Sequence, residues 1–188
     1  MKKKLPFLFL TLSLFFSQLT SAQYVSERSI DVVAGYGLSV PYDDVNVTGT
    51  GFYMQGEYVH PITTWFELRP YAGVIFAKTR FRDDEPPGPR FRSDSNGALL
   101  GGKARLVAPI PWVAPYVEGG IGVSIGSFET FSSGTDLQAS GLIYHIPFAL
   151  GLALGPENNF DVAFTYYFHP TVRQFAGAAA FGVSIPLD

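Results

Sequence analysis

Apolar and polar positions alternate with a period of two along much of the chain. From Ile30 to Val40 the even-numbered residues are apolar, whereas the odd-numbered residues between them are mostly small or polar. A period of two indicates β-strands, because successive side chains point to opposite faces of a sheet. Eight such segments predict an all-β chain, with strands at 28–40, 51–60, 65–80, 97–109, 113–127, 138–154, 159–169 and 174–187.

The connections between these strands differ in length. After the second, fourth, sixth and seventh strands they are short, and all four contain proline. After the first, third and fifth strands they are longer and more polar, at 41–50, 81–96 and 128–137. Long loops at one end and tight turns at the other are typical of an antiparallel up-and-down barrel of the outer-membrane type. No internal repeat and no linker divides the chain after residue 22, so residues 23–188 are expected to form one domain.

The two faces of the predicted strands differ in composition. One carries large apolar side chains, and the other is rich in Gly, Ala and Ser with a few charges of both signs. A water-facing sheet would carry many Lys, Glu and Thr residues, so the small face is assigned to a narrow lumen and the apolar face to lipid. The ionisable residues on the small face are Glu57, Glu67, Arg69, Lys103, Arg105, Glu118, His145 and Asp161.

The first six of these residues lie on four adjacent predicted strands, and we expect them to form a network of ion pairs in the lumen. Buried charges require partners, so the network has a structural interpretation as a plug that fixes strand register. A gate or a proton-linked path is the functional interpretation. The lumen is also expected to hold Tyr53, Gln55, Tyr71 and Tyr116, which leaves no room for a diffusion pore.

Aromatic residues gather near the predicted strand ends. Trp65 and Trp112, the two tryptophans, both lie beside short turns and are expected to anchor the barrel at the periplasmic interface. The opposite ends carry Phe52, Phe81, Phe128 and Phe175. Two such girdles are expected of a membrane barrel, because aromatic rings favour the depth of the lipid headgroups.

The first 22 residues are interpreted as a cleaved signal peptide. Three Lys precede an apolar run at 5–16, which is too short to span a bilayer, and Thr20-Ser21-Ala22 provides small residues for cleavage before Gln23. Removing these three Lys moves the formal net charge from −3 to −6, which argues against a nucleic-acid partner. The chain has no Cys, which excludes disulfides, Cys-ligated metals, a thiol nucleophile and a lipoprotein anchor.

The export signal, the eight strands and segments such as Pro115-Tyr116-Val117-Glu118-Gly119-Gly120-Ile121-Gly122 resemble the small outer-membrane β-barrel family, the OmpA/OmpX/OmpW-like group. The resemblance covers residues 23–188, although this chain ends Ile185-Pro186-Leu187-Asp188 rather than in an aromatic residue. It implies a monomeric, non-enzymatic protein of the bacterial outer membrane with a role in envelope integrity or in binding through surface loops. Lipid and lipopolysaccharide are the expected partners, and no cofactor or metal is expected.

Two features could carry further chemistry. Some members of the group are lipid A deacylases, in which the catalytic His is followed two positions later by Ser and then by Asn. Here the run reads His169-Pro170-Thr171-Val172, so His169 is interpreted as a loop residue and a lipid A hydrolase remains an alternative. A narrow channel for small apolar solutes is the other alternative. The charged 80–94 segment could contact lipopolysaccharide phosphates through Arg80, Arg82, Arg90 and Arg92, or contact a partner protein, or be a solvated loop.

Overall fold

The computed structural model describes residues 27–43, 46–81 and 90–187. The predicted signal peptide at 1–22 and Arg82 lie outside these residues. Within the described ranges, no helix is long and apolar enough to cross a membrane.

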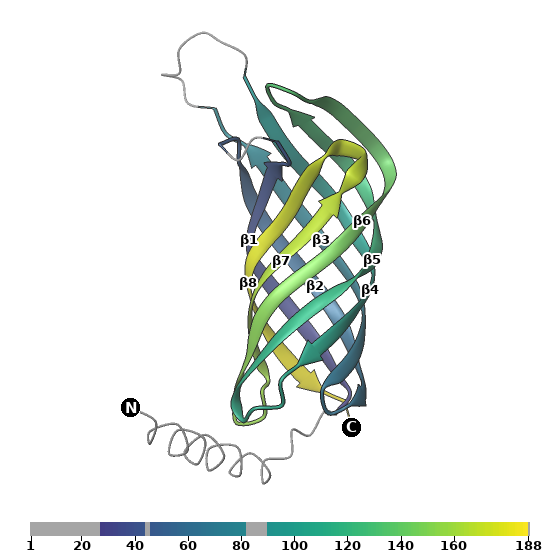
Figure 1. Cartoon of the computed structure of the whole chain (residues 1–188), viewed down its shortest axis with the longest axis vertical. Coiled ribbons are helices and arrows are strands. Elements are labelled where there is room, and N and C mark those ends of the chain that lie inside the picture. The colour runs from purple at the N-terminus through teal and green to yellow at the C-terminus, as the bar shows by residue number, and fades with distance from the viewer. Residues whose placement is uncertain (1–26, 44–45, 82–89, 188) are drawn as a thin grey trace, which may run out of the picture.

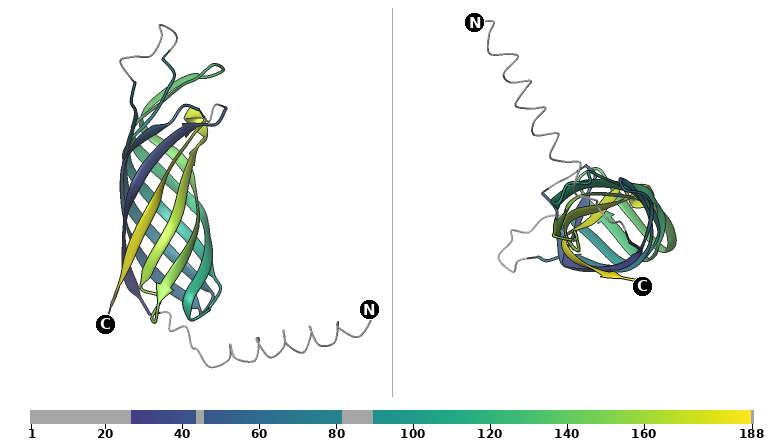
Figure 2. Two further views of the ribbon diagram at one scale, coloured as in Figure 1. Left: turned by 90° about the vertical axis from the view of Figure 1, so that its left-hand side faces the viewer. Right: turned by 90° about the horizontal axis from the view of Figure 1, so that it is seen from below.

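Eight antiparallel strands form one closed barrel in which every strand pairs with its neighbours in sequence and β8 pairs with β1 (Figures 1 and 2). The strands are β1 (Ser29–Pro41), β2 (Gly49–Thr63), β3 (Phe66–Thr79), β4 (Arg92–Val107), β5 (Trp112–Phe131), β6 (Asp136–Gly155), β7 (Phe160–His169) and β8 (Gln174–Pro186). A single turn of 3-10 helix, η2 (Pro170–Val172), joins β7 to β8. The predicted eight-stranded up-and-down barrel is confirmed.

The two ends of the barrel differ. At the turn end, β1 begins, β8 ends, and short connections join β2 to β3, β4 to β5 and β6 to β7. At the opposite end, here called the loop end, β1 and β3 end, β2 and β4 begin, and the connections at 132–135 and 170–173 lie. The register between β1 and β8 runs without a shift from Ser29 opposite Pro186 to Pro41 opposite Gln174, so the barrel closes along the full length of β1.

Alternate residues point into the barrel and away from it, as the period of two predicts. The interior side chains are almost fully enclosed, among them Tyr53, Ile75 and Leu99 at 1% exposure or less. The exterior carries large apolar side chains, with Ile121 70% and Leu142 67% exposed. Soluble proteins rarely expose a continuous surface of this kind, whereas lipid accepts it, and this pattern is that of a transmembrane barrel.

The predicted loop-end boundaries of three strands were wrong, whereas β7 ends at His169 and β8 begins at Gln174 as predicted. β4 begins at Arg92 rather than at 97. β5 continues to Phe131 and β6 already begins at Asp136, so the predicted loop at 128–137 is a hairpin in which four residues join the two strands. Figure 1 shows this hairpin rising above the other strands. A strand that leaves the membrane can be polar on both faces, so the loss of alternation marks the edge of the lipid rather than the end of the strand.

Candidate functional site

The lumen near the turn end holds a cluster of ion-paired side chains, here called the charge cluster. Cross-strand register brings opposite charges together, with Glu67 opposite Arg105 and Arg105 opposite Glu118. All of its members are buried, with exposures of 4% or less. They are Asp31, Glu57, Glu67, Arg69, Lys103, Arg105, Glu118 and Asp161.

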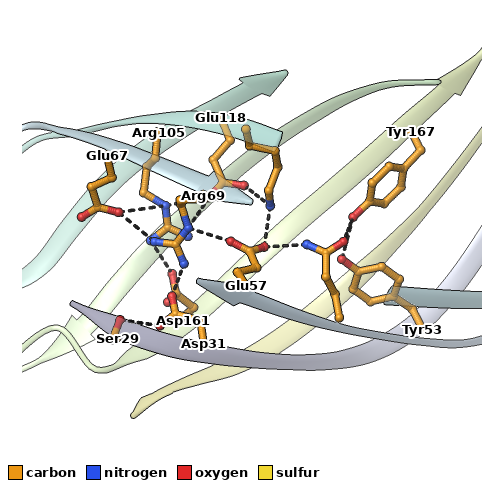
Figure 3. A network of polar contacts seen from close by, with 12 residues as sticks. Ser29, Asp31, Tyr53, Glu57, Glu67, Arg69, Arg105, Glu118, Asp161 and Tyr167 are labelled. Carbon is orange, nitrogen blue, oxygen red and sulfur yellow. Dashed lines mark hydrogen bonds and ion pairs between the residues drawn. The ribbon is translucent and has the colours of Figure 1, made fainter. Parts of the chain in front are cut away.

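Arg69 lies at the centre of the charge cluster (Figure 3). Its Nε donates to Glu57 Oε2 at 2.6 Å, its Nη1 donates to Glu67 Oε2 at 2.8 Å, and its Nη2 donates to Asp31. Asp31 is a further acid that the sequence-based network did not include. Its place on the small face of β1 was already visible from the alternation, and this is the signal that could have found it.

The remaining bases of the charge cluster add acids from two more strands, β5 and β7. Lys103 Nζ bridges Glu57 and Glu118 at 2.5 Å from each. Arg105 Nε donates to Glu118 Oε1 at 2.6 Å, and its Nη1 donates to Asp161 Oδ1 at 3.2 Å. The guanidinium of Arg105 also lies 3.6 Å from the centre of the Tyr116 ring. The structure therefore brings together all six residues of the predicted network.

A second polar group continues from the charge cluster toward the middle of the barrel. Gln55 Nε2 donates to Glu57 Oε1 at 2.6 Å, and Gln55 Oε1 accepts from the Tyr167 hydroxyl. The hydroxyls of Tyr167 and Tyr53 lie 2.8 Å apart (Figure 3). Tyr71 and Tyr116 are also buried, so the four residues expected to fill the lumen do lie inside it.

Ser124, His145, His169 and Tyr71 form a third group, here called the His–Ser cluster. Ser124 Oγ lies 2.7 Å from His145 Nδ1 and 2.8 Å from His169 Nε2, and the Tyr71 hydroxyl lies 2.5 Å from His145 Nε2. The interpretation of His169 as a loop residue was wrong, because its ring is fully enclosed in the lumen. Ser124 had no distinguishing signal among the many small residues of the inner face.

Two glycines make room for the His–Ser cluster. Gly101 and Gly122 are paired across β4 and β5. A Cβ added at Gly122 would lie 2.4 Å from both His145 Nε2 and the Tyr71 hydroxyl oxygen, and one at Gly101 would lie 2.7 Å from that oxygen. The hydrogen bond between Tyr71 and His145 therefore occupies the space of two missing side chains.

At the loop end the lumen is filled by uncharged residues. Gln174 donates to Ser39 and accepts from Thr130 at 2.8 Å. The Phe128 ring is fully buried against His169, with ring centroids 4.7 Å apart. Phe128 was predicted to lie in an aromatic girdle, and this was wrong, because β5 continues past the membrane and its inner face continues with it. Side chains thus fill the lumen from the charge cluster to Phe128.

The predicted interfacial and loop residues lie on the surface. Trp65 and Trp112 are exposed at the turn end, 54% and 62% respectively, while Phe52 is exposed nearer the loop end. Arg80 is exposed, and Arg90 lies 5.5 Å from the centre of the Phe81 ring. Arg92 is the first residue of β4 and is paired with Glu129 of β5.

One contact joins two of the connections at the loop end. Ser132 Oγ donates to Asp43 Oδ1 at 2.9 Å, and Thr135 Oγ1 donates to Asp43 Oδ2 at 2.7 Å. The hydrogen bonds from Thr135 and Ser132 lower the pKa of the Asp43 carboxyl below its usual value. Asp43 thus ties the 42–48 connection to the tip of the β5–β6 hairpin. In the described part of the chain, no three His, Asp or Glu side chains are grouped so that they could hold a metal ion.

Comparison with known proteins supports the fold. No protein-family model and no curated protein sequence matches the chain. Among solved structures, the chain is similar to Neisserial surface protein A, with a TM-score of 0.58 and 12% identity over 85% of this chain and 97% of that one. It also matches the N-terminal β-barrel domain of Pseudomonas aeruginosa OprF (TM-score 0.49, 15% identity, 85% and 98% covered) and the outer membrane enzyme PagL (TM-score 0.46, 16% identity, 84% and 99% covered). At these identities the likeness shows the fold, that of the small eight-stranded outer-membrane barrels.

Proposed function

We propose that this protein is a non-enzymatic, non-conducting barrel of the bacterial outer membrane that acts through the elements it holds above the lipid. The observation that carries the proposal is the filled lumen. Ion pairs, hydrogen-bonded rings and small polar side chains succeed one another along the barrel axis, and most of the side chains concerned are 5% exposed or less. Such an interior supports a rigid scaffold and leaves no path for solutes.

The loop end supplies the surface that a binding role requires. β4, β5 and β6 continue together past the other strands, because Arg92 still pairs with Phe131 and Phe131 with Asp136. β7 pairs with β6 only from Ile146 to Leu154. In the described part of the chain, the edge of β6 on the β7 side therefore pairs with no strand from Asp136 to His145, and η2 covers part of it, where Val172 and Ile143 share a buried cluster. An unpaired edge of this kind can add a strand from a partner.

Labelling of intact cells tests the location and the orientation. The chain has no natural Cys, so single cysteines report without background. With Gln138→Cys at the hairpin edge, we expect labelling by a membrane-impermeant maleimide on intact cells. With Glu157→Cys in the turn between β6 and β7, we expect labelling only after the outer membrane is permeabilised. The reverse pattern, or labelling of both on intact cells, would contradict the proposed orientation.

Planar bilayer recordings test the filled lumen. The reconstituted protein is expected to give no conductance steps under conditions in which a general porin opens. Regular steps from the purified protein would favour the alternative of a narrow channel and would end the non-conducting proposal.

One observation favours the alternative of a lipid A hydrolase: Ser124 lies within hydrogen-bonding distance of two His rings. Ser124 is fully enclosed, and Phe128 covers His169 on the loop side, so an acyl substrate has no approach to the hydroxyl. We therefore propose that the cluster is structural. Mass spectrometry of lipid A from cells that express the protein should show unchanged acylation. Loss of acyl chains in cells with the wild type, but not in cells with Ser124→Ala, would favour the hydrolase.

A further inference from the structure

At the loop end, β4, β5 and β6 continue as a three-stranded sheet whose two outer edges differ (Figure 1). The edge on the β4 side is blocked by a side chain. The N–H of Ser93 donates to Thr79 Oγ1 at 2.8 Å, and that hydroxyl donates to the Ser93 carbonyl oxygen at 3.2 Å. The N–H of Thr79 in turn donates to Asp94 Oδ1 at 2.8 Å. The backbone groups of Ser93 are therefore satisfied without a further strand, which is one way in which proteins protect a sheet edge.

The edge on the β6 side has no such protection. η2 reaches this edge at Ile143, which shares a buried cluster with Val172. Above that contact, in the described part of the chain, residues 136–140 pair with β5 alone, and they are here called the hairpin edge. Lys, Pro and inward-pointing charges commonly protect an edge strand, and residues 137–140 contain none of these. The hairpin edge is thus open, whereas the opposite edge of the same sheet is closed.

The register of the hairpin fixes which backbone groups face the open side. The N–H of Ser132 donates to the Thr135 carbonyl oxygen at 2.8 Å, and β5 and β6 pair without a shift from there down the hairpin. Successive residues of an antiparallel strand direct their N–H and C=O groups to opposite sides, so Leu137 and Ala139 face β5, as Thr135 does. The residues of the hairpin edge whose N–H and C=O groups face away from β5 are Asp136, Gln138 and Ser140. These groups extend over about 14 Å at the usual rise of a strand.

The side chains of the hairpin edge differ between its two faces. Leu137 and Ala139 are half-buried on the inner face, where they pack against the buried cluster that contains Phe128. The outer face is polar and exposed. Asp136 lies on this outer face and belongs to none of the ion pairs among the described residues. A strand that matches both faces has apolar side chains on the inside and polar ones on the outside, with a base near Asp136.

We propose that the hairpin edge binds an extended segment of another polypeptide, which joins the sheet as a strand beside β6. An extended main chain is the ligand whose own N–H and C=O groups recur at the spacing of this edge. Apolar residues at every second position of the segment cover Leu137 and Ala139, and a Lys or Arg pairs with Asp136. This inference rests on the proposed function, because the edge is accessible to such a partner only when the loop end faces the cell exterior.

Amide hydrogen exchange, measured by NMR on residues 23–188 in detergent micelles, tests the geometry and the binding together. In the free protein, the amides of Gln138 and Ser140 should exchange fast, whereas β5 should hold those of Leu137 and Ala139 and slow them about tenfold or more. The probe is an acetylated heptapeptide amide in which Val and Thr alternate after an N-terminal Lys. The control peptide is N-methylated at two successive central residues, which removes a donor from each of its edges.

With saturating probe peptide, exchange at Gln138 and Ser140 should slow about fivefold or more, and the N-methylated peptide should leave it unchanged. Gln138→Pro removes a donor from the open side without touching the bonds to β5, and it should weaken peptide binding about fivefold or more, as expected for one lost backbone hydrogen bond. Gln138→Ala keeps that donor and is the matched control, so it should bind like the wild type. Asp136→Asn should weaken binding of the Lys peptide but not of a peptide with Thr in place of Lys.

Slow exchange of Gln138 and Ser140 in the free protein would overturn the proposal, because the edge would already be covered; a dimeric protein in that experiment would identify a second copy of the chain as the occupant. Equal binding by Gln138→Pro and Gln138→Ala, or protection by the N-methylated peptide, would overturn it as well. The proposed function fails separately, if Gln138→Cys is not labelled on intact cells. Labelling there without any effect of the probe peptide removes the added strand and leaves the proposed orientation in place.

Discussion

Removing Arg69 should destabilise the barrel more than any change on its surface. The guanidinium is 2% exposed and is bound by three carboxylates, those of Asp31, Glu57 and Glu67. Arg69→Ala leaves these acids facing one another in a lumen shielded from water. Breaking a buried ion pair on one side costs about 3–5 kcal/mol, so we expect a loss of that size in the free energy of unfolding.

Deleting one of the three acids should restore part of this loss. Glu67 accounts for one of the three close contacts of Arg69, so about a third of the cost, 1–1.7 kcal/mol, should appear as coupling between Arg69→Ala and Glu67→Ala. Glu67 also lies 3.9 Å from Arg105. Glu67→Ala alone loses this longer contact as well, and the loss adds to the cost of that single variant. The double variant should therefore be more stable than the sum of the single losses predicts.

Urea unfolding in thin phospholipid vesicles provides the measurement. Trp65 and Trp112 lie on the lipid-facing surface, and their emission should shift to the red when the chain leaves the membrane. The denaturant slope must stay the same in all four proteins for the comparison to hold. A coupling below about 0.3 kcal/mol would refute the pairing of Arg69 with Glu67. A cost of Arg69→Ala below 1 kcal/mol would show that water solvates these charges.

Two further predictions follow from glycine packing and from the loop tether. Gly122→Ala should cost about 2–4 kcal/mol in the same unfolding assay, because its Cβ overlaps the Tyr71–His145 hydrogen bond; adding Tyr71→Phe should recover part of the cost, and Gly119→Ala, which meets no atom within 4 Å, should be neutral. The Asp43 tether should persist above the usual carboxyl pKa of about 3.9 and be lost as the pH falls through the lower folded-state pKa. Hydrogen exchange of residues 131–136 should accelerate over that range in the wild type, whereas Asp43→Asn should be fast at every pH; a pH response that is unchanged in Asp43→Asn would exclude this tether.

The alternation in the sequence was sufficient to predict the barrel because lipid and lumen impose opposite demands on successive residues. It placed Glu57, Arg69 and Lys103 on the same inward face, and adjacent strands then brought them into contact. The same rule also placed Asp31 inward, although its partner Arg69 lies two strands away on β3 and became clear only from the registers of β1 against β2 and of β2 against β3. Fold and inward face thus depend on local pattern, which one sequence contains.

The His–Ser cluster could not be predicted in this way. Ser124, His145 and His169 come from β5, β6 and β7, and only the register of three strands brings their polar atoms within 3 Å of one another. A period of two states which face a residue occupies, but it says nothing about its height along the barrel. The extension of the β5–β6 hairpin above the membrane was not predicted for a related reason. Water, unlike lipid, does not require apolar and polar residues to alternate there.

In this lumen, the side chains of Tyr71 and Tyr116 fit only beside glycines, because a barrel of eight strands is narrow. The Tyr71 hydroxyl fits where Gly101 and Gly122 lack side chains, and a Cβ at Gly151 would come within 2.4 Å of the Tyr116 hydroxyl. Tyr71 and Tyr116 therefore each depend on a glycine directly across on the neighbouring strand, Gly101 and Gly151. Enlarging the glycine displaces the ring, whereas truncating the ring leaves a void whose cost grows with its volume. The glycine content of the chain is thus a condition for filling the lumen with aromatic and charged side chains, and with it for the closed interior on which the proposed function rests.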